Sequence, residues 1–211
     1  MREHPILPVT EDLQYRAIGL VRGIYRPDNT KVLSRGSLLI NNEVQIEAVV
    51  LGRMIYLMKR HIDLKSSHLW VVYPRSRDTS QLHFQISGIW EPSTLSKNQV
   101  KKISNKKNGE IVDQLIEGDD YFSIRGELIY TKPEQNELVV KIRQSFKSNG
   151  KKNAPFKLRL KGTIPLEQLR HFVNLDVRRI NQELHIENYN IISPMKTRGG
   201  SSKKNTNKYK K

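Results

Sequence analysis

The 211-residue chain contains no cysteine, and this absence excludes several classes of protein at once. Without thiols the chain cannot form a disulfide framework, an iron–sulfur cluster, a thiolate zinc site or a cysteine nucleophile. Long apolar runs are also missing, because all are shorter than ten residues, whereas a membrane-spanning helix needs about 20. The first eight residues lack the apolar stretch of a secretory signal. We therefore expect a soluble, cytoplasmic protein with no membrane association.

Acidic residues are scarce in two parts of the chain. Asp and Glu number 21 against 37 Lys and Arg, which gives a formal net charge of +16. Residues 1–97 are close to balanced, with 13 basic and 9 acidic residues. Residues 138–166 hold eight basic residues and no acid, and residues 196–211 hold seven and no acid. Such concentrated positive charge is typical of proteins that bind polyanions, nucleic acid above all.

Catalytic signatures are missing as well. The chain has no Walker A motif, Gly-x-Gly-x-x-Gly, Gly-x-Ser-x-Gly or His-Glu-x-x-His. His68, His83, His171 and His185 occupy matching places in the two halves, but without the helical spacing or neighbouring carboxylate of a metal site. We read them as surface or edge-strand residues. The sequence predicts no enzymatic activity, no cofactor and no metal, although carboxylates that only the fold would bring together remain an open alternative.

An internal repeat relates the two halves of the chain. A Tyr-x-x-Ile motif begins at Tyr15 and again at Tyr121. A Leu-His pair begins at Leu82 and again at Leu184, followed in both copies by Ile and Pro at identical spacing. Two motifs repeated in the same order predict a duplication. The expected organisation is a first domain, a polar linker, a second domain and a disordered basic tail, over residues 12–95, 96–118, 119–195 and 196–211.

Each half contains five runs with the composition and alternation of β-strands. In the first half they cover residues 16–25, 31–40, 44–51, 68–73 and 82–90. In the second half they cover residues 121–131, 137–144, 156–162, 172–177 and 184–192. A short helix is expected between the third and fourth strand of each half, over 52–64 and 165–170, and another in the linker around 111–116. For the first half, a mixed α/β arrangement with only a partial repeat is the alternative.

Five strands with a helix between the third and fourth resemble the OB-fold, the small Greek-key barrel that binds oligonucleotides and oligosaccharides. The resemblance rests on element order and on the repeat. It implies a mainly β protein with two tandem antiparallel barrels. It also implies that the face of the second and third strands is the binding surface.

Strict alternation in the second half places a row of cations on that face. Residues 138–143 and 156–161 point their apolar side chains inward and their basic ones outward. The predicted nucleic-acid-binding residues on these strands are Lys141, Arg143, Lys157, Arg159 and Lys161. The connecting loop adds Lys147, Lys151 and Lys152, and the tail adds Lys203, Lys204, Lys208, Lys210 and Lys211. The alternative is a solvated strand face or a flexible loop, but an ordinary solvated face mixes charges of both signs.

Aromatic residues at strand ends are candidates for stacking on unpaired bases. We select Tyr25, Tyr73 and Tyr130 for this role. The leading hypothesis is a non-enzymatic protein that binds single-stranded RNA or DNA with low sequence specificity, RNA being favoured. The alternative is a protein–protein adaptor or accessory subunit of a ribosomal, replication or transcription complex, which docks through the nearly neutral first half and its tryptophans, Trp70 and Trp90.

Overall fold

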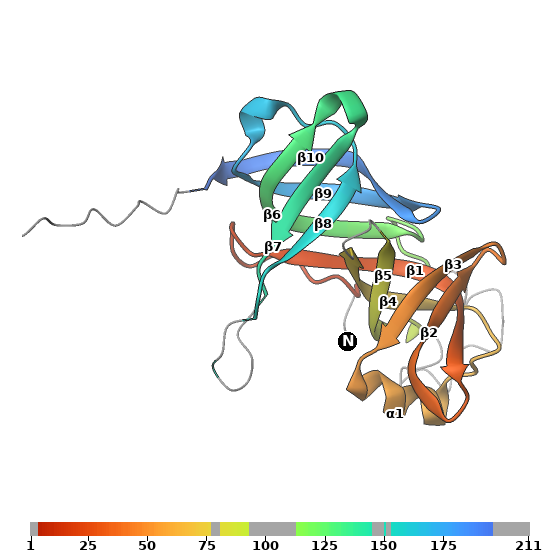
Figure 1. Cartoon of the computed structure of the whole chain (residues 1–211). Coiled ribbons are helices and arrows are strands. Elements are labelled where there is room, and N and C mark those ends of the chain that lie inside the picture. The colour runs from red at the N-terminus through yellow and green to blue at the C-terminus, as the bar shows by residue number, and fades with distance from the viewer. Residues whose placement is uncertain (1–3, 77–80, 93–112, 145–149, 151–152, 196–211) are drawn as a thin grey trace, which may run out of the picture.

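The structure is a computed structural model that describes residues 4–76, 81–92, 113–144, 150 and 153–195. Two β-barrels follow one another along the chain and are joined into a single ten-stranded sheet (Figure 1). The fold is therefore mainly β, as the alternation in the sequence predicts. The expected linker helix around 111–116 begins outside the described residues, and in its described part only Asp113 is helical, whereas residues 114–116 are not.

The first barrel consists of β1 (Arg16–Asn29), β2 (Val32–Ile40), β3 (Val44–Val50), β4 (His68–Ser76) and β5 (Leu82–Ile89). Its strands pair in the order β1-β2-β3-β5-β4, and β4 pairs with β1 to close the barrel. All these pairs are antiparallel except that of β3 with β5. Helix α1 (Gly52–His61) connects β3 to β4, and Met54 and Met58, one turn apart, are buried against the core.

The second barrel repeats this order of strands. It consists of β6 (Tyr121–Lys132), β7 (Glu137–Ile142), β8 (Phe156–Lys161), β9 (His171–Ile180) and β10 (Glu183–Pro194). The strands pair in the order β6-β7-β8-β10-β9, and β9 pairs with β6. β10 pairs with β8 at one position only, His185 with Lys161, so that most of this edge of β8 is not paired with β10. The predicted element order of both halves is confirmed.

One predicted element differs in kind. Residues 165–170 were expected to form a short helix, but only the 3₁₀ turn η2 (Leu166–Gln168) forms there. Both ends of this segment are tied to β6, because Thr131 Oγ1 donates to the Ile164 carbonyl and the Arg170 N–H donates to the Leu128 carbonyl. A second 3₁₀ turn, η1 (Pro133–Gln135), links β6 to β7.

The barrel cores are filled by the inward side chains of each strand. In β7, Leu138, Val140 and Ile142 are buried, and in β8, Leu158 and Leu160 are buried, while the residues between them face outward. Each fully buried side chain of this size contributes about 1.5–3 kcal/mol relative to an exposed one. The inward and outward faces of these two strands are those that the sequence predicts.

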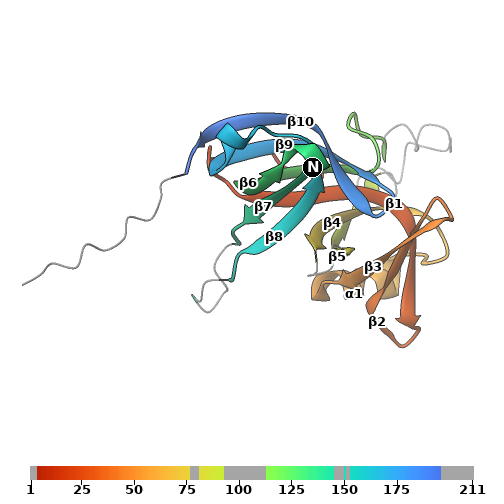
Figure 2. The same cartoon turned by 45° about the horizontal axis from the view of Figure 1, so that its top comes forward.

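β1 joins the two barrels, and Figure 2 shows it lying between their strands. Its first residues, Arg16–Gly19, pair with Phe122–Arg125 of β6. A side chain at position 19 has no room, because a Cβ there would lie 2.0 Å from the ring of Phe122. The Phe122 ring stacks on Phe84 of the first barrel at 5.8 Å, so the apolar cores of the two barrels form one cluster.

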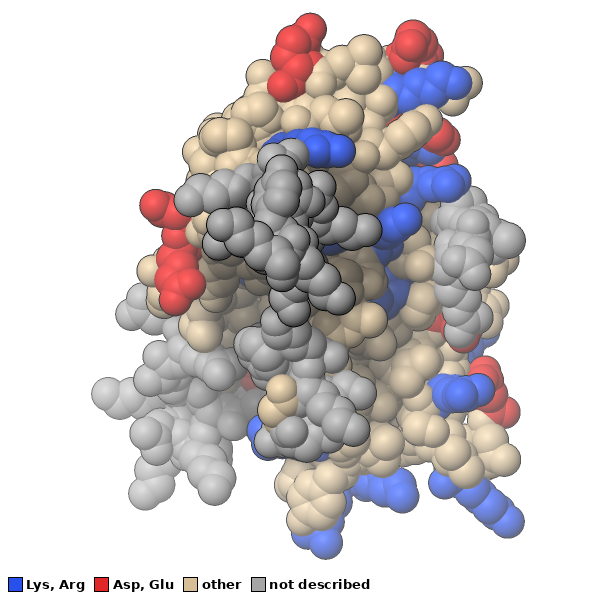
Figure 3. Space-filling view, turned by 60° about the vertical axis from the view of Figure 1, so that its left-hand side comes forward, with Lys and Arg blue, Asp and Glu red and all other residues tan. Residues whose placement is uncertain are grey.

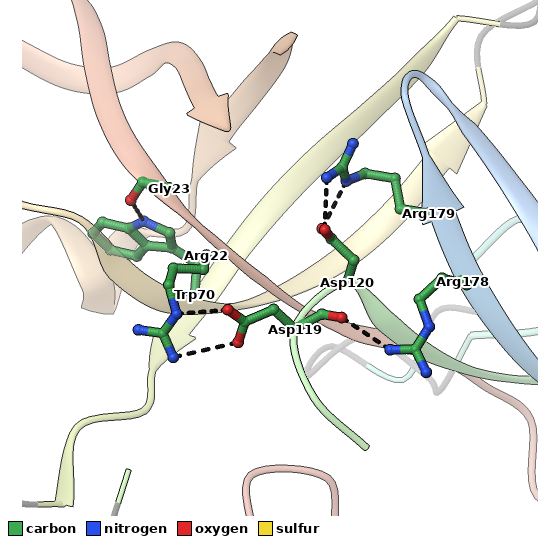
Figure 4. A network of polar contacts seen from close by, with 7 residues as sticks. All are labelled: Arg22, Gly23, Trp70, Asp119, Asp120, Arg178 and Arg179. Atoms are coloured by element: carbon green, nitrogen blue, oxygen red, sulfur yellow. Dashed lines mark hydrogen bonds and ion pairs between the residues drawn. The ribbon is translucent and has the colours of Figure 1, made fainter. Parts of the chain in front are cut away.

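A network of arginines and aspartates ties the start of β6 to both barrels (Figure 4). Asp119 accepts from Arg22 of β1 at 2.6 and 3.3 Å, and its carbonyl accepts from Arg178 of β9 at 2.9 Å. Asp120 holds Arg179 of β9 through two hydrogen bonds of 2.7 Å. The barrels are therefore held in one orientation by strand pairing, a shared core and charged hydrogen bonds.

Candidate nucleic-acid interface

The outer face of β6, β7 and β8 carries three cross-strand rows of side chains. Directly paired residues on antiparallel strands point to the same face, with their Cβ atoms about 4.5–5.5 Å apart. The register of these strands gives the rows Glu127-Lys141-Lys157, Tyr130-Val139-Arg159 and Lys132-Glu137-Lys161. We call these nine residues the outer face.

Glutamates divide the predicted row of cations. Lys141 Nζ lies 2.9 Å from a Glu127 carboxylate oxygen, and Lys161 Nζ lies 3.2 Å from Glu137. Both acids come from outside residues 138–166, and cross-strand pairing brings them onto the face. Glu183 of β10 also lies 3.6 Å from Lys161, whose pKa is raised chiefly by its hydrogen bond to Glu137. The expectation of an acid-free face is wrong, because it counted charge along the chain rather than across strands.

Lys157 and Arg159 are the cations of this face that remain open to a ligand. Both side chains are exposed, and neither forms an ion pair with another residue in the described part of the chain. Tyr130 lies in the same row as Arg159 and is 43% exposed, which leaves a ring face accessible to a base. The outer face therefore combines two exposed, unpaired cations with one stacking surface.

The free edge of β8 is covered by the end of β4 from the first barrel. Ser76 Oγ accepts the Arg159 N–H at 3.2 Å, and the guanidinium of Arg75 lies 3.8 Å above the centre of the Phe156 ring. The second barrel thus presents its outer face next to the first barrel. Figure 3 shows the side of the molecule where β7 ends and β8 begins, with Lys and Arg gathered in a band and Asp and Glu nearer the margins.

A cleft of about 590 Å³ opens between the two barrels at the start of β8. We call it the interbarrel cleft. Its walls come from the segment before β1, from β1 itself, from β4 and β5, and from the ends of β7 and β8. Its charged and aromatic lining residues are Tyr15, Arg16, Tyr73, Arg75, Arg143 and Phe156. No Asp or Glu of the described segments lines it.

Burial perturbs the ionisable groups of the interbarrel cleft. Desolvation lowers the pKa of Arg75. It also lowers the pKa of Arg16, and repulsion from Arg125 lowers that pKa further. Burial likewise raises the pKa of Tyr15. Both arginines nevertheless stay charged at neutral pH. They are therefore partly dehydrated cations, which an anionic ligand would stabilise.

The other predicted site residues fall in three kinds of place. Tyr73 lines the interbarrel cleft, and Arg143 stands at its rim, 49% exposed. Tyr25 is not a stacking residue: it is 1% exposed, its hydroxyl donates to the Leu33 carbonyl, and burial raises its pKa to about 12. Eight predicted cations of the loop and the tail lie outside the described residues: Lys147, Lys151, Lys152, Lys203, Lys204, Lys208, Lys210 and Lys211.

Apart from Tyr73, sequence reasoning missed the contribution of the first barrel to this region. Arg75 and Tyr15 lie in the nearly neutral first half, where charge counting gives no signal. Phe156 shares the alternation of Leu158 and was expected to point inward, but at the end of its strand it is only partly buried. Trp70, one of the two tryptophans expected to dock a protein partner, is fully buried and donates to the Gly23 carbonyl.

The described segments contain neither a candidate metal centre nor a candidate membrane-spanning helix. No group of three or more His, Asp or Glu there is placed to hold a metal ion. No helix in the same segments is long and apolar enough to cross a membrane.

Comparison with known proteins matches each half of the chain to an RNA-binding domain. Residues 17–97 match the N-terminal OB-fold domain of the PatR RNA-binding protein, and residues 124–193 match a C-terminal cyanobacterial OB-fold-like RNA-binding domain. Neither a search of curated proteins nor one of solved structures found a match. The two family models together cover most of both barrels. The chain therefore belongs to the OB-fold superfamily, with two tandem OB-fold domains of the PatR RNA-binding type.

Proposed function

We propose that the chain binds single-stranded RNA without catalysing a reaction, and with low sequence specificity. The strand lies on the outer face of β6, β7 and β8. The observation that carries this proposal is the pair of exposed, unpaired cations Lys157 and Arg159 on the second-barrel face that OB-folds use for oligonucleotides. Lys141 and Lys161, held by glutamates, contribute less, because part of their charge is already neutralised.

The mechanism we propose is neutralisation of phosphates combined with limited stacking. Each phosphate contact releases counterions, so the affinity falls steeply with salt. Tyr130, in line with Arg159, offers its ring to an unpaired base. The seven basic residues of 196–211 supply additional charge that needs no fixed geometry. Nothing on this face selects one base over another, which is why we propose low specificity.

Charge reversal on β8 tests this proposal. Binding of labelled single-stranded RNA is measured by fluorescence anisotropy for the natural chain and for Lys157→Glu/Arg159→Glu. The matched control is Arg53→Glu/Lys59→Glu, which makes the same change of charge on exposed positions of α1. The β8 variant should lose at least tenfold in affinity and the control far less. Equal losses in the two variants would contradict a specific role of the outer face.

The nucleic-acid class is tested with the same assay. Double-stranded RNA and single-stranded DNA of equal length compete against the labelled RNA at fixed salt. We expect duplex RNA to compete poorly, because a barrel face with a stacking ring contacts unpaired bases. Duplex RNA that competes as well as the single strand would mean that the chain recognises charge alone and makes no contact with unpaired bases.

A further inference from the structure

We propose that the interbarrel cleft takes up one unpaired nucleotide of the bound RNA, holding its base against the Arg75–Phe156 pair and its phosphate near Arg143. The site lies beyond the outer face and is built by both barrels. The inference rests on the proposed function, because it places a second contact on the same strand. The size of the cleft, about 590 Å³, falls within the roughly 300–1,000 Å³ of ordinary small-ligand pockets.

The chemistry of the lining fits a nucleotide better than an apolar or a cationic ligand. Three arginines supply positive charge, three aromatic rings supply stacking surface, and no acid of the described residues lines the cleft. Gln14, Gln85 and Gln144 also line it. Each amide both donates and accepts hydrogen bonds, as the edge of a base requires. Few other common ligands combine an anion, a flat ring and mixed hydrogen-bonding groups.

The Arg75–Phe156 pair provides the stacking surface. The guanidinium carbon of Arg75 lies 3.8 Å from the centre of the Phe156 ring, so the two planar groups are in contact across the two barrels. Bases stack on aromatic rings and on guanidinium planes alike. Arg75 is half-buried, and this partial burial lowers the pKa of its guanidinium. A nearby phosphate would restore the lost stabilisation of its charge.

Two residues that line the cleft, Tyr15 and Arg16, carry polar atoms whose hydrogen-bonding capacity is unused. Tyr15 Oη and Arg16 Nε are buried and have no hydrogen-bond partner among the described residues. Buried polar groups normally have a hydrogen-bond partner, and leaving one without a partner is unfavourable. Both residues line the cleft, so their side chains border the nucleotide that we place there.

The cleft is continuous with the outer face. Phe156 directly precedes Lys157, whose side chain lies on the outer face. Arg143 lines the cleft, and it reaches within 3.8 Å of Glu127 of the outer face and lies 5.6 Å above the Tyr15 ring. An RNA strand bound to Lys157 therefore passes close to the mouth of the cleft. One base of the bound RNA can turn into the cleft, so that no second ligand is needed to occupy it.

A cycle of abasic RNA and protein variants tests this inference. A single-stranded RNA of about ten nucleotides is made with one abasic position, moved along the strand, and bound to the natural chain, to Arg75→Gln and to Phe156→Leu. Melting temperature and circular dichroism verify that each variant is folded, and Arg75→Gln leaves the Phe156 ring in place. The control is Tyr56→Leu, which removes an exposed ring that also carries an arginine, Arg60 at 4.5 Å.

For the natural chain and the control, one abasic position should weaken binding by roughly 5- to 150-fold, the range expected for one stacked base. In Arg75→Gln and in Phe156→Leu, an abasic site at that position should weaken binding no more than an abasic site elsewhere in the strand. An abasic profile that is the same in all four proteins would overturn the inference while leaving RNA binding intact. Failure of the natural chain to bind the intact RNA would overturn the proposed function instead.

A free nucleoside monophosphate distinguishes a nucleotide of the strand from a small-molecule ligand. We expect it to bind only weakly, and to be displaced by the intact RNA. Tight binding of the monophosphate that persists in saturating RNA would contradict the inference, because the occupant would then be a free nucleotide.

Discussion

Replacing Asp120 with asparagine should destabilise the protein by about 2–3 kcal/mol. Asp120 accepts two hydrogen bonds of 2.7 Å from Arg179, whose side chain is 4% exposed, whereas Asp120 itself is 20% exposed. Removing one partner of a buried pair costs about 3–5 kcal/mol, because the other charge is left without compensation. We reduce this figure because water reaches the Asp120 side chain and because the amide oxygen of Asn still accepts one hydrogen bond.

Asparagine is the appropriate substitution at this position. Asp120 has a φ of 65°, in the left-handed region that Asp and Asn adopt most readily among residues with a side chain. Its N–H donates to the Leu20 carbonyl and its carbonyl accepts from the Arg179 N–H, and both backbone contacts remain in the variant. The measured change therefore reports the loss of the carboxylate rather than strain in the backbone.

The neighbouring residue provides a matched control. Asp119 makes a bidentate contact with Arg22, but these side chains are 41% and 40% exposed. Exposed pairs of this kind contribute about 0–1 kcal/mol, so Asp119→Asn should have a small effect. Both variants are compared with the natural chain by urea unfolding, followed by circular dichroism and tryptophan fluorescence. Equal losses of stability in the two variants would refute the reasoning, since it depends on the difference in burial.

Two further predictions concern stability. Gly19→Ala should lower the free energy of unfolding by at least about 1–3 kcal/mol, because the added Cβ would lie 2.0 Å from the Phe122 ring; urea unfolding checks this, and an unchanged midpoint would contradict the packing at the junction. The hydrogen bond to Glu91 is the main reason why the pKa of His68 is raised. His68 therefore stabilises the fold below the unfolded pKa of about 6.5, and this contribution is lost as the pH rises through the raised value. The stability difference between the natural chain and His68→Gln should shrink as the pH rises above about 6.5; a difference that stays constant would argue against the pair.

The order of strands was predictable because each strand carries its own signal. Alternation in residues 156–161 indicates which side chains are buried, and the structure agrees. The internal repeat predicted that the two halves share one fold, and the same order of strands recurs in both barrels. The turn at 166–168 was mistaken for a helix because Pro165 at a helical start is a local signal, whereas the segment is held at both ends by hydrogen bonds to β6.

The arrangement of charge was predictable only in part. The sequence identified Lys157 and Arg159 but not the glutamates that neutralise Lys141 and Lys161, because pairing across strands brings together residues distant along the chain. Of the interbarrel cleft, the sequence identified Tyr73 and Arg143 but not Tyr15, Arg16 or Arg75. Its walls come from segments far apart along the chain, and their meeting depends on how β1 pairs with β6.

The salt dependence of RNA binding is the most direct test of the proposed function. Affinity for single-stranded RNA is measured from about 50 to 200 mM salt for the natural chain and for Lys157→Gln/Arg159→Gln. Each phosphate contact contributes about 0.7 to the slope of log affinity against log salt. Loss of both cations should therefore lower the slope by about 1.4 and, at about 0.1 M salt, weaken binding roughly 25-fold. A slope unchanged by the two substitutions would show that the outer face does not bind the phosphate backbone.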